Sequence, residues 1–284
     1  MKVLVFGASG MIGQAMFRVL SQANHLDVMG TVRSEHSKKF FPDAMAKNLT
    51  GNVDLGNQDT LLRVISQARP DVVINCVGIT KHLAASKDPL VSIAINALLP
   101  HRMAQVCLAL NARLIHISTD CIFSGSKGHY AEDSPADADD LYGKSKYLGE
   151  VTSSGVMTLR TSTIGHELES TFGLLEWFLS QQTVCKGYSR AIFSGLPNTV
   201  FAEVIRDHVL TNPDLSGLYH VGAKAIDKYE LLCLIRQVYG KSISITEDNE
   251  FVMDRSLDSD RFKKATGYIA PDWTELIQSM YSFR

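Results

Sequence analysis

Three glycines in the stretch GASGMIG, residues 7–13, constrain the fold of this chain more than any other feature. They follow residues 2–6 (KVLVF), an apolar run typical of a buried strand, and they open a segment with helical periodicity. Gly7 permits a tight turn, Gly10 lets a phosphate approach the backbone, and Gly13 lets helix and strand pack closely. A helix N-terminus also offers free N–H groups to phosphates. This position therefore favours a dinucleotide site over an ordinary strand-to-helix turn.

Strand-like and helix-like segments alternate through the first 160 residues, and this predicts an α/β fold with a Rossmann-type, doubly wound parallel sheet. The predicted strands are residues 2–6, 26–32, 71–77, 112–118 and 156–160, with a short element near 49–55. The predicted helices are residues 10–23, 58–68, about 89–110 and the segment around 142. Later segments are helices near 172–181, 201–210, 229–239 and 273–281, and a strand at 217–222. We expect residues 1–160 to form the dinucleotide-binding domain, and residues 161–284 to form mostly a smaller substrate-binding lobe with returns to the main domain.

Composition excludes several classes of partner. Hydrophobic residues make up 45% of the 284 residues, the net charge is −2, and no basic run stands out, so we expect neither a nucleic acid nor a membrane partner. The apolar run at the N-terminus is too short for a signal peptide. The five cysteines are scattered and odd in number, which indicates reduced thiols and a cytoplasmic protein. The histidines, among them His82, His101, His166 and His220, lack ligand spacing, so we propose no metal.

The stretch LYGKSKYLGE, residues 141–150, places Tyr142 and Lys146 one helical turn apart on the same face. An ammonium group beside a phenol lowers the pKa of the phenol, which would give a proton donor that works near neutral pH. Lys144 and Tyr147 in the same stretch are decoys. Taken alone, the Tyr-Lys spacing is weak, and surface residues are the alternative reading.

The glycine spacing and Tyr142-x-x-x-Lys146 together resemble the extended short-chain dehydrogenase/reductase family. Other short motifs occur in the order typical of this family: Asp54-Leu55 after the third strand, NCVGIT (residues 75–80) after the fourth, and Ser118-Thr119-Asp120 after the fifth. Carboxyl ends of strands are where open sheets bind ligands. The catalytic residues that the resemblance implies are Thr119, Tyr142 and Lys146. The cofactor-binding residues that it implies are Gly7, Ser9, Gly10, Met11, Ile12, Gly13, Arg33, Asp54, Leu55, Cys76, Val77, Gly78, Tyr142 and Lys146.

Four segments resemble one branch of the family, the dTDP-4-dehydrorhamnose reductases. STDCIFSG is similar to their STDYVFDG, LRTSTIG to LRTSWVYG, GLYHVG to their GIYH segment, and RSLDSDRF to a late Arg-x-x-x-Leu-Asp segment. The resemblance implies a homodimer that uses NADPH to reduce the 4-keto group of a dTDP- or UDP-linked 6-deoxy sugar, for the synthesis of surface polysaccharide. Cys121 replaces a Tyr and Thr163 replaces a Trp, which suggests a wider pocket that could hold an N-acetylated sugar. The substrate-binding residues that follow are Asp120, Cys121, Thr163 and Arg255.

The expected mechanism has Tyr142 donating the proton, Lys146 lowering its pKa and binding the nicotinamide ribose, and Thr119 polarising the carbonyl. The second strand ends without an acid before Glu35, and Arg33 is placed to pair with a 2′-phosphate. We therefore expect NADPH to be preferred and NADH to be accepted less well.

Several alternatives stay open at this point. A 4-epimerase with tightly bound NAD would use the same three catalytic residues, and some relatives are non-catalytic, cofactor-sensing regulatory subunits. Dehydration is disfavoured because Cys121 stands where dehydratases have Glu. Arg160 could meet a phosphate or hold a loop, and Arg255 could do either as well. His116 alternates with isoleucines and is interpreted as structural.

Overall fold

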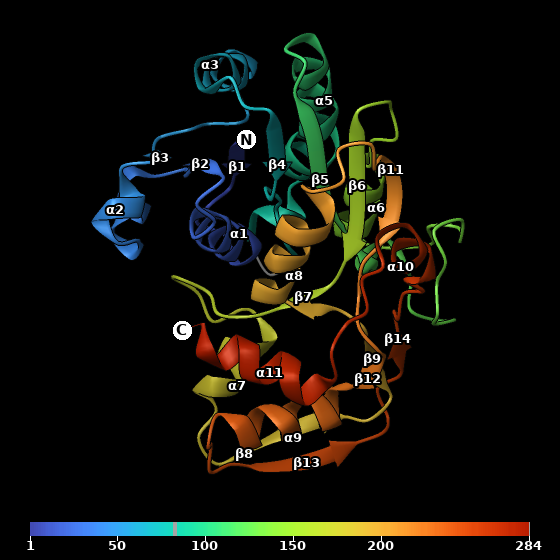
Figure 1. The fold of residues 1–284 in the computed structure, drawn as a ribbon. Coiled ribbons are helices and arrows are strands. Elements are labelled where there is room, and N and C mark those ends of the chain that lie inside the picture. Colours follow the sequence, from blue (N-terminus) through green and yellow to red (C-terminus); the bar gives the residue numbers. More distant parts are fainter. Residues whose placement is uncertain (82–83, 284) are drawn as a thin grey trace.

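The computed structural model describes residues 1–81 and 84–283, so His82 lies outside the described residues. Within them, seven parallel strands form a central sheet in the order β11-β6-β5-β4-β1-β2-β3 (Figure 1). Their bounds are β1 (Lys2–Phe6), β2 (Asp27–Thr31), β3 (Leu49–Thr50), β4 (Val72–Asn75), β5 (Arg113–Thr119), β6 (Val156–Thr161) and β11 (Gly217–His220). The order of strands reverses between β1 and β4, and in open α/β sheets ligands bind at the carboxyl ends of the strands beside such a reversal. The predicted fold class is confirmed.

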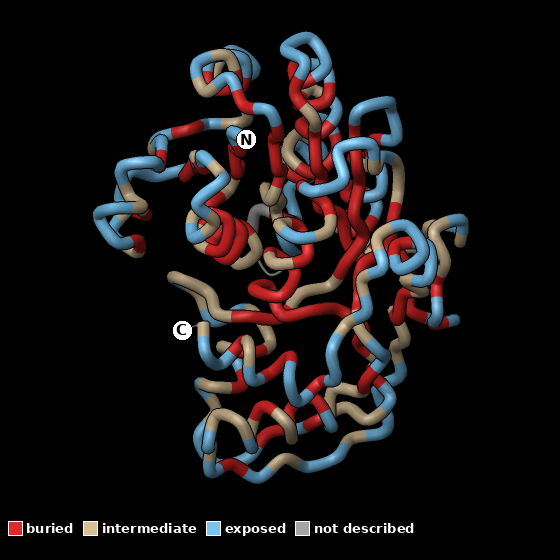
Figure 2. The backbone as a smooth tube through the Cα atoms, viewed as in Figure 1, coloured by how far each residue is buried: buried red, intermediate tan, exposed pale blue. Residues whose placement is uncertain are grey.

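Alternating side chains of β1 divide the core into two layers. Val3 and Val5 belong to one buried cluster, which includes side chains of α1 (Met11–Ser21), α8 (Asn198–Val204) and α11 (Trp273–Ser282). Leu4 and Phe6 point to the other face and join the side chains of α3 (Gln58–Ala68) and α5 (Leu99–Ala109). Both faces are covered, which explains why the strands of a parallel sheet are apolar throughout. Figure 2 shows the central strands buried, with exposed residues on the loops and outer helices.

The long helix predicted at residues 89–110 is present, but it is not uniform. It consists of α4 (Pro89–Ser92), the π-helical η3 (Ile93–Leu98) and α5. Pro100 has no N–H to donate to the carbonyl of Asn96, and this loss is a known cause of irregular helix geometry. A Cβ atom on Gly149 would lie only 1.9 Å from that same carbonyl oxygen, so the segment around Gly149 packs closely against η3.

Most of the remaining strands, with α7 (Leu174–Ser180) and α9 (Lys228–Val238), build the lower part of the molecule in Figure 1, and the other short helices lie around the sheet. Short strands pair as β7 (Thr163–Ile164) with β10 (Leu196–Pro197), β8 (Val184–Tyr188) with β13 (Ser244–Asp248), and β12 (Ile226–Asp227)-β9 (Ala191–Phe193)-β14 (Met253–Asp254). The other helical segments are η1 (Glu35–Phe40), α2 (Asp43–Ala46), η2 (Ala84–Lys87), η4 (Asp120–Ile122), α6 (Leu141–Leu148), η5 (Ile205–Val209) and α10 (Asp260–Thr266).

The short strands outside the central sheet, together with α7 and α9, are called the lobe below. The chain passes between the sheet and this lobe more than once. After β6 it enters the lobe at β7, returns through α8 and η5 to cover the sheet, and then adds β11 at the edge of β6. Asn198, the first residue of α8, donates its side-chain N–H to the carbonyl of Met11 at 2.7 Å, which ties this return to the glycine turn. The division of the chain between residues 160 and 161 stays a prediction.

Candidate active site

The glycine turn has the geometry of a phosphate cradle. Gly7 has a φ of 79°, in the left-handed region that favours glycine. A Cβ atom on Gly13 would lie 2.0 Å from the Gly7 oxygen, so the close packing of helix and strand requires glycine there. A Cβ on Gly10 would meet protein only at an ordinary 3.5 Å. Gly10 is also the N-cap of α1, and no side chain caps the N–H groups that follow it. The space and the free donors at Gly10 suit a phosphate ligand.

The groups predicted to recognise the adenosine half of a cofactor lie along the neighbouring strand ends. Arg33 follows β2 and is exposed, and its guanidinium makes no hydrogen bond or ion pair with any described residue. Asp54 is exposed after β3, where its carboxylate accepts the Gly56 N–H at 2.9 Å. Asn57, rather than Asp54, caps α3. The arrangement leaves the Arg33 side chain free to bind a ligand.

The loop after β4 is held in a fixed shape by two buried asparagines. Asn75 accepts the N–H of Val77 at 3.0 Å, which orients the turn containing Cys76 and Gly78. Asn96 of η3 accepts the N–H of Ile79 at 2.8 Å and donates to the Ile79 carbonyl at 3.0 Å. Its side chain also donates to the Ser145 hydroxyl of α6 at 3.1 Å. The loop that would line the cofactor is thus tied to the helix that carries Tyr142.

Helix α6 carries both residues of the Tyr142-x-x-x-Lys146 pattern and packs directly on the end of β5. Asp140 caps the helix, because its carboxylate accepts the Gly143 N–H at 2.6 Å. A Cβ atom on Gly143 would lie 2.3 Å from the Cys121 carbonyl oxygen, so glycine allows α6 to approach η4. This approach brings Tyr142 beside Thr119, and the structure therefore unites residues from two distant parts of the sequence.

Thr119 and Asp120 form the polar floor of this site. The Thr119 hydroxyl donates to the Asp120 carboxylate at 3.0 Å and accepts the Cys121 N–H at 3.1 Å. Both side chains are buried, with 8% of each residue exposed. Burial raises the pKa of the Asp120 carboxyl above its ordinary value, although the hydrogen bond from Thr119 and the charge of Arg255 act in the opposite direction.

The expectation that Lys146 lowers the pKa of Tyr142 is wrong for this arrangement. Burial raises the pKa of the Tyr142 phenol, and the nearby Cys121 and Asp120 raise it further, while hydrogen bonding with Thr119 opposes the shift. The Lys146 ammonium instead donates to the carbonyl of Ile117 at 2.7 Å. Burial lowers the pKa of Lys146 to about 8. Tyr142 consequently remains protonated at neutral pH, which suits a proton donor.

The structure places the predicted substrate-binding residues unequally. Asp120, Cys121 and Arg255 lie together: the Arg255 guanidinium donates to the Phe123 carbonyl at 2.8 Å and to the Cys121 sulfur at 3.4 Å. Thr163 lies in β7, paired with Leu196 of β10, and no hydrogen bond joins it to Thr119 or Tyr142 among the described residues. Arg255 therefore holds the Phe123 loop and still reaches the site.

Two lysines that sequence reasoning missed complete the site. Lys81 follows β4 and Lys228 begins α9, and their charges act on Asp120 and Cys121. Neither ammonium group makes a hydrogen bond or ion pair within residues 1–81 and 84–283. Burial lowers the pKa of Lys228, and the charges of Lys81 and Arg255 lower it further. Lys228 also stands at a helix N-terminus, where a cation is unfavourable. An excess of unpaired positive charge at this point fits an anionic ligand.

Arg160 holds a loop, which is one of the two roles that the sequence left open for it. Its guanidinium forms a buried pair with Glu150 at 2.8 Å and donates to the Glu132 carbonyl at 3.0 Å. Ser118 donates to the same Glu150 carboxylate at 2.7 Å. His116 is fully buried and contacts the Asn75 amide at 3.1 Å. These contacts hold the carboxyl ends of β5 and β6 together.

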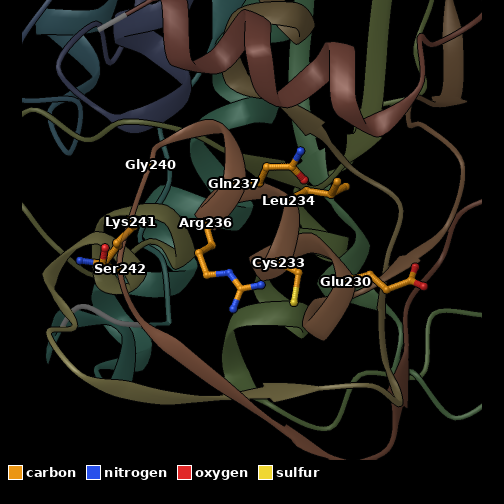
Figure 3. Close-up of a pocket in the computed structure, with 8 residues that line it drawn as sticks. All are labelled: Glu230, Cys233, Leu234, Arg236, Gln237, Gly240, Lys241 and Ser242. Atoms are coloured by element: carbon orange, nitrogen blue, oxygen red, sulfur yellow. The ribbon is translucent and has the colours of Figure 1, made fainter.

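A separate hollow lies away from these residues. It has a volume of about 740 Å³ and follows α9 and the loop after it, as Figure 3 shows. Its lining residues are Glu230, Cys233, Leu234, Arg236, Gln237, Gly240, Lys241 and Ser242. Arg236 and Lys241 each donate to a backbone carbonyl, of Ile243 at 3.5 Å and of Leu179 at 2.7 Å, so both support the loops. None of the predicted site residues lines this hollow, and we do not place the active site there.

The described residues show neither a metal centre nor a membrane span. Across residues 1–81 and 84–283, no group of three or more His, Cys, Asp or Glu side chains is placed to hold a metal ion. In the same part of the chain, no helix is long and apolar enough to cross a membrane.

Comparison with known families matches residues 1–175 to the RmlD substrate binding domain. The chain belongs to this family. A dTDP-4-dehydrorhamnose reductase from Streptomyces griseus is 31% identical over 148 residues, which is 52% of this chain and 43% of that protein. Methionine adenosyltransferase 2 subunit beta from Mus musculus is 24% identical over 259 residues, 84% of this chain and 72% of that protein. The chain spans about half the length of the first curated reductases that it matches.

Solved structures agree with the fold over the whole chain. A dTDP-4-dehydrorhamnose reductase from Bacillus anthracis, solved in complex with NADP, has a TM-score of 0.80 at 20% identity and covers 99% of each chain. A dTDP-4-dehydrorhamnose reductase from Clostridium acetobutylicum has a TM-score of 0.81 at 20% identity, and the match covers 100% of this chain and 99% of that one. The similarity in fold thus extends beyond residue 175.

Proposed function

We propose that this protein is a reductase that uses NADPH to reduce the 4-keto group of a nucleotide-linked 6-deoxy sugar. One observation carries the proposal: Tyr142 lies beside Thr119 at the end of β5, and Lys146 on the same helix donates to the Ile117 carbonyl of β5, at the same sheet edge as the glycine turn. The similarity to reductases of dTDP-4-dehydrorhamnose supports this reading.

The cofactor would lie across the carboxyl ends of β1, β2 and β4. Its diphosphate fits the free N–H groups after Gly10, and Arg33 is available for a 2′-phosphate. Bound there, the nicotinamide would supply the hydride. Lys146 would orient the nicotinamide ribose, and the Tyr142 phenol would donate the proton to the carbonyl oxygen. Exclusion of water by the buried floor strengthens each of these interactions.

The diphosphate of the sugar nucleotide would lie among Lys81, Lys228 and Arg255. Three cations near one carboxyl group leave a net positive charge, and a diphosphate would neutralise it through charge-assisted hydrogen bonds. Lys228→Gln should weaken UDP or dTDP binding by about 1.5–3 kcal/mol, the value of a hydrogen bond to a charged group. Lys144→Gln, an exposed lysine of α6, is the matched control and should leave binding unchanged.

The activity is tested with dTDP- and UDP-linked 4-keto-6-deoxy sugars, with and without an N-acetyl group. We expect stoichiometric NADPH oxidation and a 4-hydroxy product with at least one of them, identified by NMR. An absence of turnover with all substrates would overturn the proposal. Tightly bound NAD that survives purification, together with epimerisation of the unoxidised sugar, would instead show a 4-epimerase.

A second candidate function is a regulatory subunit. The observation that favours it is the similarity to methionine adenosyltransferase 2 subunit beta, which covers 84% of this chain. The presence of Thr119 and Lys146, both buried, together with the partly buried Tyr142 favours the enzyme, because a sensor needs the cofactor site but no proton donor. Cofactor binding without turnover, together with a copurifying partner enzyme, would support the regulatory role.

We further propose a cytoplasmic homodimer. All five cysteines are free thiols, as a reducing compartment would keep them. Exposed apolar side chains on the packed helices α4, η3 and α6, among them Leu90, Ile93 and Leu148, offer a surface for a second copy. Sedimentation of the wild type and of Leu148→Asp tests this: the variant should sediment as a monomer.

A further inference from the structure

The Thr119 hydroxyl is committed to Asp120 in a way that conflicts with its expected role. It donates to Asp120 Oδ1 at 3.0 Å and accepts the Cys121 N–H at 3.1 Å. A hydroxyl has one proton to donate. While this proton points to the Asp120 carboxylate, Thr119 cannot donate a hydrogen bond to a carbonyl oxygen or to Tyr142.

Protonation of Asp120 releases the Thr119 proton for one of these two acceptors. A neutral carboxyl group can donate its own O–H to Thr119 Oγ1, and the Thr119 hydroxyl is then free to turn toward Tyr142, which the packing of α6 on η4 brings beside it. Asp120 is 92% buried, and burial favours its neutral form. The charge of Asp120 therefore decides whether Thr119 donates its proton to Asp120 or to Tyr142.

We propose that Asp120, Thr119 and Tyr142 form a proton relay in which neutral Asp120 replaces the proton that Tyr142 gives to the substrate. This inference rests on the reductase function proposed above. Asp120 acts through Thr119 and does not touch the reacting atoms, so it is a positioning and proton-supplying residue.

The transfers balance in one turnover. The carbonyl carbon receives the hydride, and its oxygen takes the Tyr142 phenolic proton. The phenolate then takes the Thr119 hydroxyl proton, and Thr119 takes the Asp120 carboxyl proton. Asp120 is left as a carboxylate, which is the acceptor seen in the structure. It regains a proton from solvent before the next turnover.

Charges around Asp120 connect the relay to substrate binding. The groups that act on its carboxyl come from several elements: Cys121 of η4, Tyr142 of α6, Lys81 after β4, Arg255 after β14 and Lys228 of α9. The cations favour the carboxylate. A bound diphosphate would neutralise them and add negative charge, so binding should favour protonation of Asp120. Binding of the substrate would thereby cause Asp120 to take up the proton that later replaces the one lost from Tyr142.

The first test measures proton uptake without turnover. UDP and dTDP are titrated into the protein at about pH 7, by calorimetry in buffers of different ionisation enthalpy. The wild type should take up protons on binding, and Asp120→Asn should lose this uptake while binding the nucleotide. Asp139→Asn, at an exposed carboxylate, is the control and should behave as the wild type. Equal proton uptake by wild type and Asp120→Asn would overturn the loading step.

The second test uses turnover. In the wild type, kcat should fall as pH rises and Asp120 loses its proton, and the proton inventory in mixed H₂O and D₂O should show several transferred protons. Asp120→Asn should lower kcat by about 10²-fold, remove that limb of the pH profile and reduce the inventory to fewer protons, with NADPH binding unchanged. An active wild type with the same pH profile and inventory as Asp120→Asn would refute the relay. An inactive wild type would instead refute the reductase function, and the proton-uptake result would still decide whether Asp120 titrates with ligand binding.

Discussion

The proposed role of Tyr142 as a proton donor is consistent with the raised pKa of its phenol. A phenol whose pKa is raised stays protonated until a developing alkoxide, which is a far stronger base, draws its proton away. Tyr142→Phe keeps the ring and removes this proton. It should lower kcat by roughly 10² to 10⁴-fold, the range for a lost general acid, with cofactor binding retained in a fluorescence titration. Tyr147→Phe, at a residue that is 48% exposed, should change little. Near-normal turnover in Tyr142→Phe would exclude it as the donor.

Arg33 is expected to set the choice between the two nicotinamide cofactors. Its guanidinium is exposed and unpaired among the described residues, so nothing within that part of the protein competes for it. Arg33→Ala should weaken NADPH use by about 1.5–3 kcal/mol in kcat/KM and leave NADH use nearly unchanged. An equal loss with both cofactors would contradict a contact with the 2′-phosphate.

His220 should make the fold sensitive to acid. It is fully buried, its Nδ1 contacts the Tyr130 carbonyl at 3.0 Å, and its Nε2 faces the Arg160 guanidinium at 3.1 Å. Burial, and then the Arg160 charge, lower its pKa from 6.5 to about 4. Between these values the unfolded chain binds the proton and the folded chain does not, so the free energy of unfolding falls as pH drops through this window, by about 3 kcal/mol.

The test for His220 is urea unfolding at several pH values. His220→Gln keeps a donor and an acceptor but cannot become charged, so its stability should fall less than that of the wild type as pH is lowered from neutral. Parallel curves for the two proteins would show that His220 is not the titrating group.

At this scale, sequence reasoning found residues in recognisable local patterns and missed those that only the fold brings together. Tyr142 and Lys146 are one helical turn apart, so their spacing is visible in the sequence. Lys81 and Lys228 come from a loop and a helix far apart in the chain, and no spacing relates them to Asp120. The sign of the Tyr142 pKa shift was also wrong, because burial is a property of the folded molecule.

At the scale of elements, two glycines in the turn between β1 and α1 have different roles: Gly13 allows close packing, and Gly10 leaves space for a ligand. Gly13 faces the Gly7 carbonyl at a distance no Cβ can accept, whereas Gly10 has ordinary space around it. Gly13→Ala should therefore destabilise the protein by about 1–3 kcal/mol, the cost of overpacking, in denaturant unfolding. Gly10→Ala should keep the wild-type stability and weaken NADPH binding, because its methyl group would occupy the space of a phosphate. Wild-type stability in Gly13→Ala would contradict the packing role of Gly13. Wild-type affinity for NADPH in Gly10→Ala would contradict the ligand-binding role of Gly10.

Periodicity predicted most elements, and its failures have local causes. The predicted strand at 2–6 and helix at 58–68 coincide with β1 and α3, since both have clear apolar patterns and, for α3, a capping Asn57. The lobe strands β7, β10, β12 and β14 have two residues each, too few to show alternation. The π-helical η3 follows from Pro100 and from the close packing of Gly149, and only the first of these is visible locally.

At the scale of the whole molecule, the sheet depends on residues that come late in the chain. β11 covers the edge of β6, and α8 packs on α1. A fragment of residues 1–175, the part matched by the family, would leave this strand edge and this apolar helix face uncovered. We expect it to aggregate or to bind a hydrophobic dye, whereas the full chain unfolds cooperatively. A soluble fragment with cooperative unfolding would show that the late elements are dispensable.

The repeated passage of the chain between sheet and lobe also limits how this protein could acquire a new specificity. One exchange of sequence between two relatives, at any single point after β6, would combine a lobe and a sheet edge from different parents. The contact between Asn198 and Met11 and the pairing of β11 with β6 would then join segments from different parents, and these segments would be complementary only by chance. A change of ligand specificity in such a chain should accordingly proceed by point substitution in the lobe, with the strands that return to the sheet unchanged.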